Sequence, residues 1–451
     1  MKTRLPTIAA ALAALVLAVL VVTPRSAQAA TGFHVAEGRL YDANGVEFVM
    51  RGVSHAHTWY PGRTGAFADI KSVGANTVRV VLSSGDRWTR NDAADVANVV
   101  ALCRQNRLIC VLEVHDTTGY GEQGGAIALD RAVDYWLSVA SALTGQEPYV
   151  IVNIGNEPYG NQNYGGWAAD TSRAIQRLRA AGFAHTLMVD APNWGQDWSF
   201  TMRDNATSVF ASDPDRNTLF AIHMYGVFDT AAEITDYLGR FRAARLPIVV
   251  GEFGHNHSDG DPDEATIMAY SQANGIGYLG WSWSGNGGGV EYLDMVADFD
   301  VTRLTGWGQR IIDGVDGIRQ TAREATVYGS PIPTASPTVS PTVGPTTPPP
   351  GPGSCVATYS IGNQWPGGFQ GEVRVTAGGT PISGWTVSWT YADGQTISQV
   401  WNATATGAGP SVTARNLAYN GGLAAGASTT FGFLGVWQGA NTVPVLRCVA
   451  S

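Results

Sequence analysis

The chain has 451 residues and a formal net charge of -9 at pH 7. This acidic balance excludes a nucleic-acid partner, which would require a basic surface. Only 14% of the residues are charged, whereas the chain contains 55 Gly, 14 Trp and 16 Tyr. The composition favours a neutral ligand that is recognised by ring stacking and hydroxyl hydrogen bonds, as a sugar polymer is.

Residues 1–30 have the pattern of a secretory signal peptide. Lys2 and Arg4 precede an apolar stretch over residues 8–22, and Ala27-Gln28-Ala29 forms a small-residue cleavage site. The apolar stretch is shorter than the ~20 residues that a transmembrane helix needs, and no later segment approaches that length. We therefore expect a secreted, extracellular protein that has no membrane partner.

Apolar runs alternate with helical-looking segments over residues 31–330. The strand-like runs are Glu47–Val53, Thr77–Leu82, Ile109–Val114, Tyr149–Ile154, His185–Val189, Leu219–Ile222, Ile248–Val250 and Ile276–Trp281. The helical-looking segments include Asp92–Gln105, Leu129–Leu143, Trp167–Ala181 and Ala231–Ala243. This alternation predicts an α/β domain of the (β/α)8 TIM-barrel type. A doubly wound open sheet is the alternative, but no Gly-rich phosphate loop follows the first run.

Residues 331–353 form a Pro/Thr/Ser-rich stretch that predicts an extended linker. Beyond the linker, residues 354–451 alternate short β-prone runs with Gly/Asn turns, which predicts an all-β sandwich module. The module has no His, and its acidic residues are Glu372 and Asp393 alone. A second acid/base site is therefore excluded there, and binding is its expected role.

The four cysteines of an exported chain are expected to pair. Their positions divide into Cys103 with Cys110 and Cys355 with Cys448, so that each predicted disulfide lies inside one domain. The spacing of the first pair also occurs in metal sites. No second thiol pair lies near it, however, and we prefer the disulfide.

Two apolar runs end on a glutamate. The run from Tyr149 leads into Asn156-Glu157-Pro158, and the run from Pro247 leads into Gly251-Glu252-Phe253-Gly254. A single glutamate at a strand end is more often a solvated loop residue. Two of them at the carboxyl ends of barrel strands share one cleft, where they can act as acid/base and nucleophile.

Other polar and aromatic residues fall at the same strand ends, and the predicted mouth of the barrel collects Arg79, His115, Asn156, Glu157, His223, Tyr225, Glu252 and Trp281. Arg79 can hold a carboxylate ionised, Asn156 can bond a sugar 2-hydroxyl, and Tyr225 can donate to Glu252. Trp281 offers a face for stacking a sugar ring. Each residue alone has an ordinary alternative, as a structural ion pair, a core histidine or a packed ring.

This set of strand-end residues resembles glycoside hydrolase family 5 over residues 35–320, without a departure. The resemblance implies a retaining glycosidase in which Glu157 is the acid/base and Glu252 the nucleophile. Within the family, the stretches 50–61, 74–82 and 281–286 resemble bacterial endo-β-1,4-mannanases, which implies mannan, glucomannan and galactomannan as substrates. Endo-β-1,4-glucanases of the family are the rival, and the substrate prediction rests on this resemblance. Trp59 and Trp283 are further candidate sugar platforms, with ordinary packing as their alternative.

Histidine pairs raise a metal-dependent hydrolase as a third hypothesis. His55-Ala-His57 follows the first run and His255-Asn-His257 follows the seventh, but the other ligands of such a site do not occur together. We therefore expect no catalytic metal and no required cofactor. Four acidic residues can hold a structural calcium, although a solvated acidic loop is the preferred interpretation; they are Glu291, Asp294, Asp298 and Asp300.

The C-terminal module resembles carbohydrate-binding module family 2 through Asn363-Gln-Trp365, Gly384-Trp385, Gln399-Val-Trp-Asn402 and Tyr419-Asn-Gly421. The resemblance implies a flat strip of exposed rings at Trp365, Trp401 and Tyr419, with Trp385 in the core and cellulose as the anchoring surface. The alternative places these rings in the core. The sequence thus predicts a monomeric, wall-anchored polysaccharide hydrolase, and a non-catalytic wall-binding protein is the remaining alternative.

Overall fold

The computed structural model describes residues 32–329, 354–365, 367–407, 409–417, 419–437 and 440–451. The predicted signal peptide (1–30) and linker (331–353) lie outside these residues, and their boundaries stay predictions. The chain divides into two compact units, Met1–Thr334 and Ala335–Ser451, which are described separately below. No helix of the described ranges has the length and apolar content that a membrane span requires.

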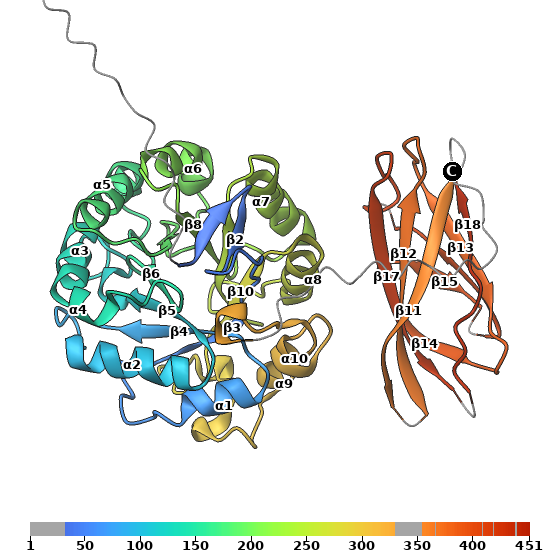
Figure 1. Cartoon of the computed structure of the whole chain (residues 1–451), viewed down its shortest axis with the longest axis horizontal. Helices are drawn as coiled ribbons and strands as arrows, with labels where there is room; N and C mark the ends of the chain where they lie inside the picture. The colour runs from blue at the N-terminus through green and yellow to red at the C-terminus, as the bar shows by residue number, and fades with distance from the viewer. Residues whose placement is uncertain (1–31, 330–353, 366, 408, 418, 438–439) are drawn as a thin grey trace, which may run out of the picture. The chain divides into compact units, whose positions relative to one another are not determined.

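The first unit is a closed barrel of parallel strands in the order β10-β3-β4-β5-β6-β7-β8-β9, which confirms the predicted TIM barrel (Figure 1). Its strands are β3 (Arg51–His55), β4 (Thr77–Leu82), β5 (Ile109–Val114), β6 (Val150–Asn153), β7 (Leu187–Asp190), β8 (Thr218–Met224), β9 (Ile248–Phe253) and β10 (Gly277–Gly280). Because helices cover the outside and side chains fill the inside, the strands are buried on both faces.

Helices surround the barrel (Figure 1). They are α1 (Ala66–Ser72), α2 (Ala93–Gln105), α3 (Leu129–Ser138), α4 (Ala140–Leu143), α5 (Trp167–Ala180), α6 (Thr201–Ser212), α7 (Ala231–Ala243), α8 (Glu264–Asn274), α9 (Gly306–Asp313) and α10 (Ile318–Thr321). Short 3-10 helices are η1 (His115–Thr117), η2 (Tyr164–Gly166), η3 (Glu291–Leu293), η4 (Ala297–Phe299) and η5 (Thr326–Tyr328). Side-chain caps fix several starts; Asp92, for example, accepts from two backbone N–H groups of α2.

An N-terminal hairpin, β1 (His34–Ala36) with β2 (Arg39–Tyr41), was not predicted. The first part of the predicted run Glu47–Val53 does not belong to the barrel, because Glu47 bridges Tyr41 and β3 begins only at Arg51. Apolar side chains from this region and from the strand starts fill the barrel interior, among them Phe33, Leu40, Phe48, Met50, Ile109, Val111, Ile151, Leu219 and Val249.

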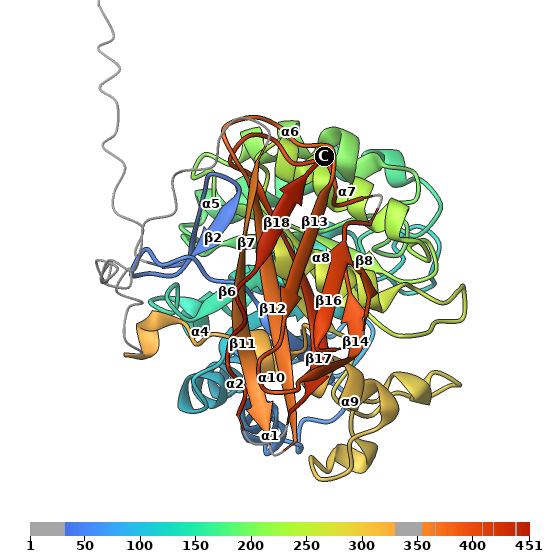
Figure 2. The same ribbon diagram turned by 90° about the vertical axis from the view of Figure 1, so that its right-hand side faces the viewer.

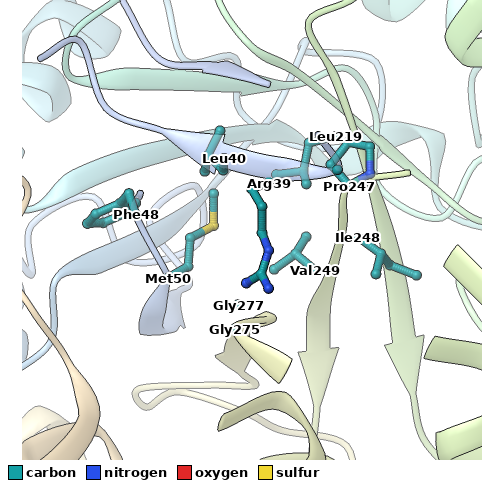
Figure 3. A pocket seen from close by; sticks show the side chains of 11 residues that line it. Arg39, Leu40, Phe48, Met50, Leu219, Pro247, Ile248, Val249, Gly275 and Gly277 are labelled. Carbon is teal, nitrogen blue, oxygen red and sulfur yellow. The ribbon is translucent and has the colours of Figure 1, made fainter. Parts of the chain in front are cut away.

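A small, open hollow lies beside this hairpin (Figure 3). Leu40, Met50 and Val249 line it, and Arg39 is the ionisable side chain among its lining residues. Arg39 already pairs with Glu47 at 2.6 Å. The hollow lies at the starts of β9 and β10, the end of a barrel that usually serves stability rather than chemistry.

The second unit consists of two four-stranded antiparallel sheets, β11-β12-β17-β14 and β15-β16-β13-β18, in agreement with the predicted all-β module (Figure 2). The strands are β11 (Cys355–Trp365), β12 (Gly368–Ala377), β13 (Trp385–Thr390), β14 (Thr396–Trp401), β15 (Thr404–Thr406), β16 (Ser411–Arg415), β17 (Ser428–Val436) and β18 (Arg447–Ala450). The predicted disulfide between Cys355 and Cys448 is present.

The predicted disulfide between Cys103 and Cys110 is not formed. Both residues are free, buried thiols on α2 and β5, and their Sγ atoms lie 2.6 Å apart. Burial, together with the hydrogen bond to Cys110, raises the pKa of the Cys103 thiol well above its ordinary value. Cys103 is therefore held as a protonated thiol, whereas the thiolate is the form that reacts.

We expect these two thiols to close into a disulfide when the folded protein is oxidised, because the Sγ atoms already face each other. Closure should be faster at alkaline pH, where more thiolate forms. Peptide mass spectrometry after mild oxidation should find residues 103 and 110 linked, with a loss of two hydrogens. Cys110→Ala is the unlinked control, and alkylatable thiols that persist in the oxidised protein would contradict this expectation.

Candidate active site

The carboxyl ends of the barrel strands bring the main predicted site residues together. Arg79 lies in β4, His223 in β8 and Glu252 in β9, while Glu157 follows β6. All four side chains are buried. Parallel strands end at one rim of the barrel, so residues far apart in the chain meet there, as the sequence predicted.

The backbone holds Glu157 in a conformation with φ of 40°, in the left-handed region that non-glycine residues rarely adopt. Its N–H donates to Asp190 Oδ2 at 3.3 Å, and its carbonyl accepts from Gly119 N–H at 3.1 Å. Such a conformation costs on the order of 1–3 kcal/mol and persists only where surrounding contacts enforce it. The turn thus fixes the direction of the Glu157 side chain.

Glu252 receives two hydrogen bonds on its carboxylate. Arg79 Nη1 donates to Oε1 at 2.6 Å and the Tyr225 hydroxyl donates to Oε2 at 3.0 Å, as predicted for Tyr225. Burial raises the pKa of Glu252, whereas the charges of His223 and Arg79 oppose that rise. The two donors therefore favour the ionised, nucleophilic form in a site that would otherwise disfavour it.

His223 lies between the two glutamates. Its Nδ1 is 2.8 Å from Glu157 Oε1 and 3.6 Å from Glu252 Oε2, and its Nε2 is 3.3 Å from Asp190 Oδ2. Burial alone would lower the pKa of His223, but the carboxylates of Glu252 and Asp190 raise it to about 10. Ligand atoms of Glu157, His223 and Glu252 all lie within 4.8 Å of one another.

Arg79 is fully buried and bonds to several groups at once. Nε and Nη2 donate to Asn153 Oδ1 at 3.1 and 2.9 Å, and Nη2 also reaches Asn156 Oδ1 at 2.7 Å and Asp190 Oδ2 at 3.2 Å. Burial works against its charge, but the surrounding carboxylates, Glu113 foremost, raise the Arg79 pKa. The guanidinium therefore stays charged and is satisfied on several sides.

Three residues of this network were missed from the sequence. Asn153 closes β6, Asp190 closes β7, and Glu113 accepts from the His115 ring, with Nδ1 and Oε1 3.0 Å apart. Each is a polar residue inside or at the end of an apolar run. That interruption is the signal that would have found them, since a buried polar side chain requires a partner.

The aromatic side chains of the predicted site divide into rim and core. Trp281 is half-buried, its ring is nearly parallel to His115 with centroids 5.8 Å apart, and its Nε1 donates to Asn286. Trp59 is also half-buried and meets His115 edge-on. Trp283 is 0% exposed, so its prediction as a sugar platform is wrong. Its ring belongs to the main apolar core instead.

Asn156 is positioned by two protein partners. Its Oδ1 accepts from Arg79, and its Nδ2 donates to Thr118 Oγ1 at 2.8 Å. An amide nitrogen carries two N–H groups, so one donor is left for a ligand hydroxyl.

The histidine pairs do not assemble a second metal site among the described residues. The one group of potential ligands found there is Glu157 with His223 and Glu252. His57 pairs with Asp95 at 3.1 Å, and burial lowers the pKa of His55 to about 3. Within that group, the carboxylates of Glu252 and Asp190 raise the pKa of His223, so that the ring carries a proton between them.

The acidic segment that was considered for calcium has its own protein partners. Asp294 accepts from Asn286, Asp298 pairs with Arg303 at 2.7 Å, and Asp300 caps Thr302. Glu291 Oε1 accepts from a backbone N–H at 3.3 Å. These contacts favour the preferred interpretation, an acidic loop bonded to itself and to solvent.

In the C-terminal module, Tyr419 is 71% exposed and donates its hydroxyl to Asn402 at 2.8 Å. Trp401 is half-buried and its ring packs against Gly432, where a Cβ would come within 2.5 Å of the ring. Trp385 is buried and stacks on Phe431, as predicted for a core residue. The side chain of Trp365 lies outside the described residues, so its place in the strip stays a prediction.

We expect the charge on His223 to make the stability of the barrel pH-dependent. Because its folded pKa of about 10 lies above the unfolded value of 6.5, its contribution is complete below pH 6.5 and is lost as the pH rises through 10. The difference in unfolding free energy between the protein and His223→Gln should shrink across that window by on the order of a few kcal/mol. Urea titrations at several pH values measure it.

His34→Gln, outside the site, is the control for general alkaline effects. A difference that stays constant from neutral to alkaline pH would show that His223 is not charged in the folded protein.

Comparison with known proteins agrees with this geometry. Residues 41–287 match the family described as cellulase (glycosyl hydrolase family 5), and residues 355–450 match the cellulose binding domain. A Streptomyces lividans protein named mannan endo-1,4-beta-mannosidase is 65% identical over 68% of this chain and 80% of its own length. A Cellvibrio japonicus protein of the same name is 48% identical over 80% of this chain and 83% of its own length.

Among solved structures, the mannohexaose complex of a Thermomonospora fusca β-mannanase is 65% identical, with a TM-score of 0.65 over 66% of this chain and all of that chain. The family match, the identity to these relatives and the buried carboxylate pair at the strand ends agree with one another. The chain belongs to glycosyl hydrolase family 5, and its C-terminal part matches the cellulose-binding domain family.

Proposed function

We propose that the protein is a secreted, retaining endo-β-1,4-mannanase that cleaves internal linkages of mannan, glucomannan and galactomannan. The observation that carries the proposal is the pair Glu157 and Glu252 at the barrel mouth, where one carboxylate oxygen of each lies within 4.8 Å of the other. Retaining glycosidases have carboxyl groups about 5–5.5 Å apart, whereas inverting enzymes need room for a water between them. The substrate class rests on the names of the relatives.

In the first step, Glu252 attacks the anomeric carbon while Glu157 gives its proton to the glycosidic oxygen. The bond between that carbon and that oxygen breaks, and the leaving chain departs with the proton. Arg79 and Tyr225 keep Glu252 ionised and aimed, since both donate to its carboxylate.

In the second step, Glu157 takes a proton from a water molecule, which attacks the anomeric carbon and releases Glu252. Forming the glycosyl ester has meanwhile consumed the charge of Glu252. Glu157, which gave up its proton in the first step, is then available as the base. Two inversions leave the configuration of the product unchanged, and side chains of the protein perform both steps without a cofactor.

Neighbouring residues are proposed to hold the sugar. The remaining N–H of Asn156 is proposed to donate to a sugar 2-hydroxyl. The half-buried rings of Trp281 and Trp59 supply stacking surfaces. Mannose and glucose differ in the orientation of that 2-hydroxyl. The region around Asn156 is therefore where the two substrates would be discriminated.

The first test is reducing-sugar release from linear mannan, glucomannan and carboxymethylcellulose. We expect release from both mannans and little from the cellulose derivative. Glu157→Gln should lower kcat by about 10²–10⁴ because the proton donor is lost, and Glu252→Gln should abolish turnover. Glu233→Gln, which alters an exposed cap of α7, is the matched control.

Activity on carboxymethylcellulose alone would make the protein an endoglucanase, and full activity in both glutamate variants would place the site elsewhere. Proton NMR of the first products tests the stereochemistry. The β-anomer should appear first, and initial α-anomer would refute the retaining mechanism.

We propose further that the enzyme is exported and held on plant cell wall by its C-terminal module. The signal-like pattern of residues 1–30 and the match to the cellulose-binding domain support this proposal. The exposed Tyr419 and the half-buried Trp401 are its candidate contacts with cellulose. A monomeric state stays a prediction.

Deleting residues 331–451 should leave hydrolysis of soluble mannan unchanged and weaken hydrolysis of mannan embedded in insoluble, cellulose-containing wall. The reason is that tethering raises the effective concentration of the enzyme at the surface. Parallel assays on both substrates measure the effect, and Trp401→Ala in the full chain is the point-variant counterpart. Equal losses on both substrates would contradict the tethering role.

A further inference from the structure

Exposed aromatic rings gather on the loop between β7 and α6, at the same end of the barrel as the active site. Trp198 is 46% exposed and Phe200 is 41% exposed, and no other aromatic side chain among residues 32–329 is comparably open. Trp194, on the same loop, is half-buried. Large exposed rings on a soluble domain commonly mark a binding surface.

The ring of Trp198 is fixed although it is exposed. Its Nε1 donates to Asn161 Oδ1 at 2.7 Å, and Tyr164 meets the ring edge-on with centroids 5.6 Å apart. The loop itself is anchored by Asp197, whose carboxylate accepts from the N–H groups of Met202 and Arg203. Because the Trp198 side chain is already held in place, it loses little conformational entropy when a ligand stacks on its ring.

A chain of contacts connects Trp198 to the turn that carries Glu157. Gly119 N–H donates to the Glu157 carbonyl, and a Cβ at Gly119 would come within 2.4 Å of the Trp194 ring. Trp194 Nε1 reaches Glu122 Oε2 at 3.3 Å, and that same oxygen accepts from Asn161 N–H at 2.5 Å. Asn161 in turn holds Trp198.

These contacts lie on the Glu157 side of the catalytic pair. Glu252 is surrounded by other elements, with Tyr225 after β8 and Arg79 in β4 donating to it. In the proposed mechanism Glu157 protonates the leaving oxygen, so the part of the polymer beyond Glu157 is the leaving chain, which carries the reducing end.

We propose that Trp198, positioned by Asn161 and Tyr164, is a distal sugar-binding subsite for the leaving chain of a β-1,4-linked hexose polymer. This inference rests on the proposed function. The exposed ring face binds a sugar ring by stacking, and the neutral amide of Asn161 beside it suits an uncharged ligand. The subsite would favour long chains over short ones and would set where an oligosaccharide is cut.

The test uses the full chain and mannan oligosaccharides from mannotriose to mannohexaose and longer, labelled at the reducing end with ¹⁸O. Trp198→Ala should lower kcat/KM for the longest substrates by roughly two- to tenfold through KM and leave the shortest unchanged, since one stacking contact is lost. The position of cleavage in long oligosaccharides should move toward the reducing end, because fewer sugar units of the leaving chain are then bound by the protein.

Trp198→Tyr keeps a planar ring and should restore most of the chain-length preference. Phe200→Ala is the matched control. The Phe200 side chain is similarly exposed, but the Arg203 guanidinium lies over its ring, 3.6 Å from the ring centroid. It should leave cutting positions unchanged.

An equal change at all chain lengths in Trp198→Ala, or an unchanged cutting pattern, would overturn the subsite while leaving the proposed function intact. Failure of the unmodified protein to cleave any β-1,4-linked oligosaccharide would overturn both.

Discussion

The buried guanidinium of Arg79 is the charge around which the candidate site is built. Removing such a group from water costs several kcal/mol, which only close partners repay. Glu252, Asn153, Asn156 and Asp190 all lie within hydrogen-bond distance of it. The same contacts fix the position and favour the ionised form of Glu252. The same electrostatic contacts thus stabilise the buried charge of Arg79 and prepare Glu252 to act as the nucleophile.

His223 extends that arrangement to the second glutamate. It lies close to Glu157, Glu252 and Asp190, and its raised pKa reflects this excess of carboxylates. A cation between two acidic side chains lets them approach within 4.8 Å, which repulsion would otherwise oppose. The spacing on which the proposed mechanism depends is therefore maintained by a third side chain, which lies between the two glutamates.

The sequence predicted the elements whose signal is local and continuous. β4 and β5 have the predicted bounds because they are uninterrupted apolar runs, and the carboxyl ends of such strands predicted Glu157 and Glu252. It failed where the outcome depends on packing. Trp281 and Trp283 differ by two positions and look alike in sequence, yet one lies at the rim and the other in the core. Asp190 and Asn153 gain their roles from partners far away in the chain, among them Arg79.

The two ends of the barrel explain how a strained, charged cluster is tolerated. Apolar side chains such as Phe33, Leu40 and Met50 fill the end near the strand starts, where the hairpin β1–β2 covers the interior. Burial of this kind contributes roughly 25 cal/mol for each Å² of apolar surface. The opposite end can then hold Glu157 at a positive φ and keep carboxylates close together, because its own contribution to stability need not be favourable. The division also explains why the hollow beside Arg39 is poor in ionisable groups while the chemistry lies at the other rim.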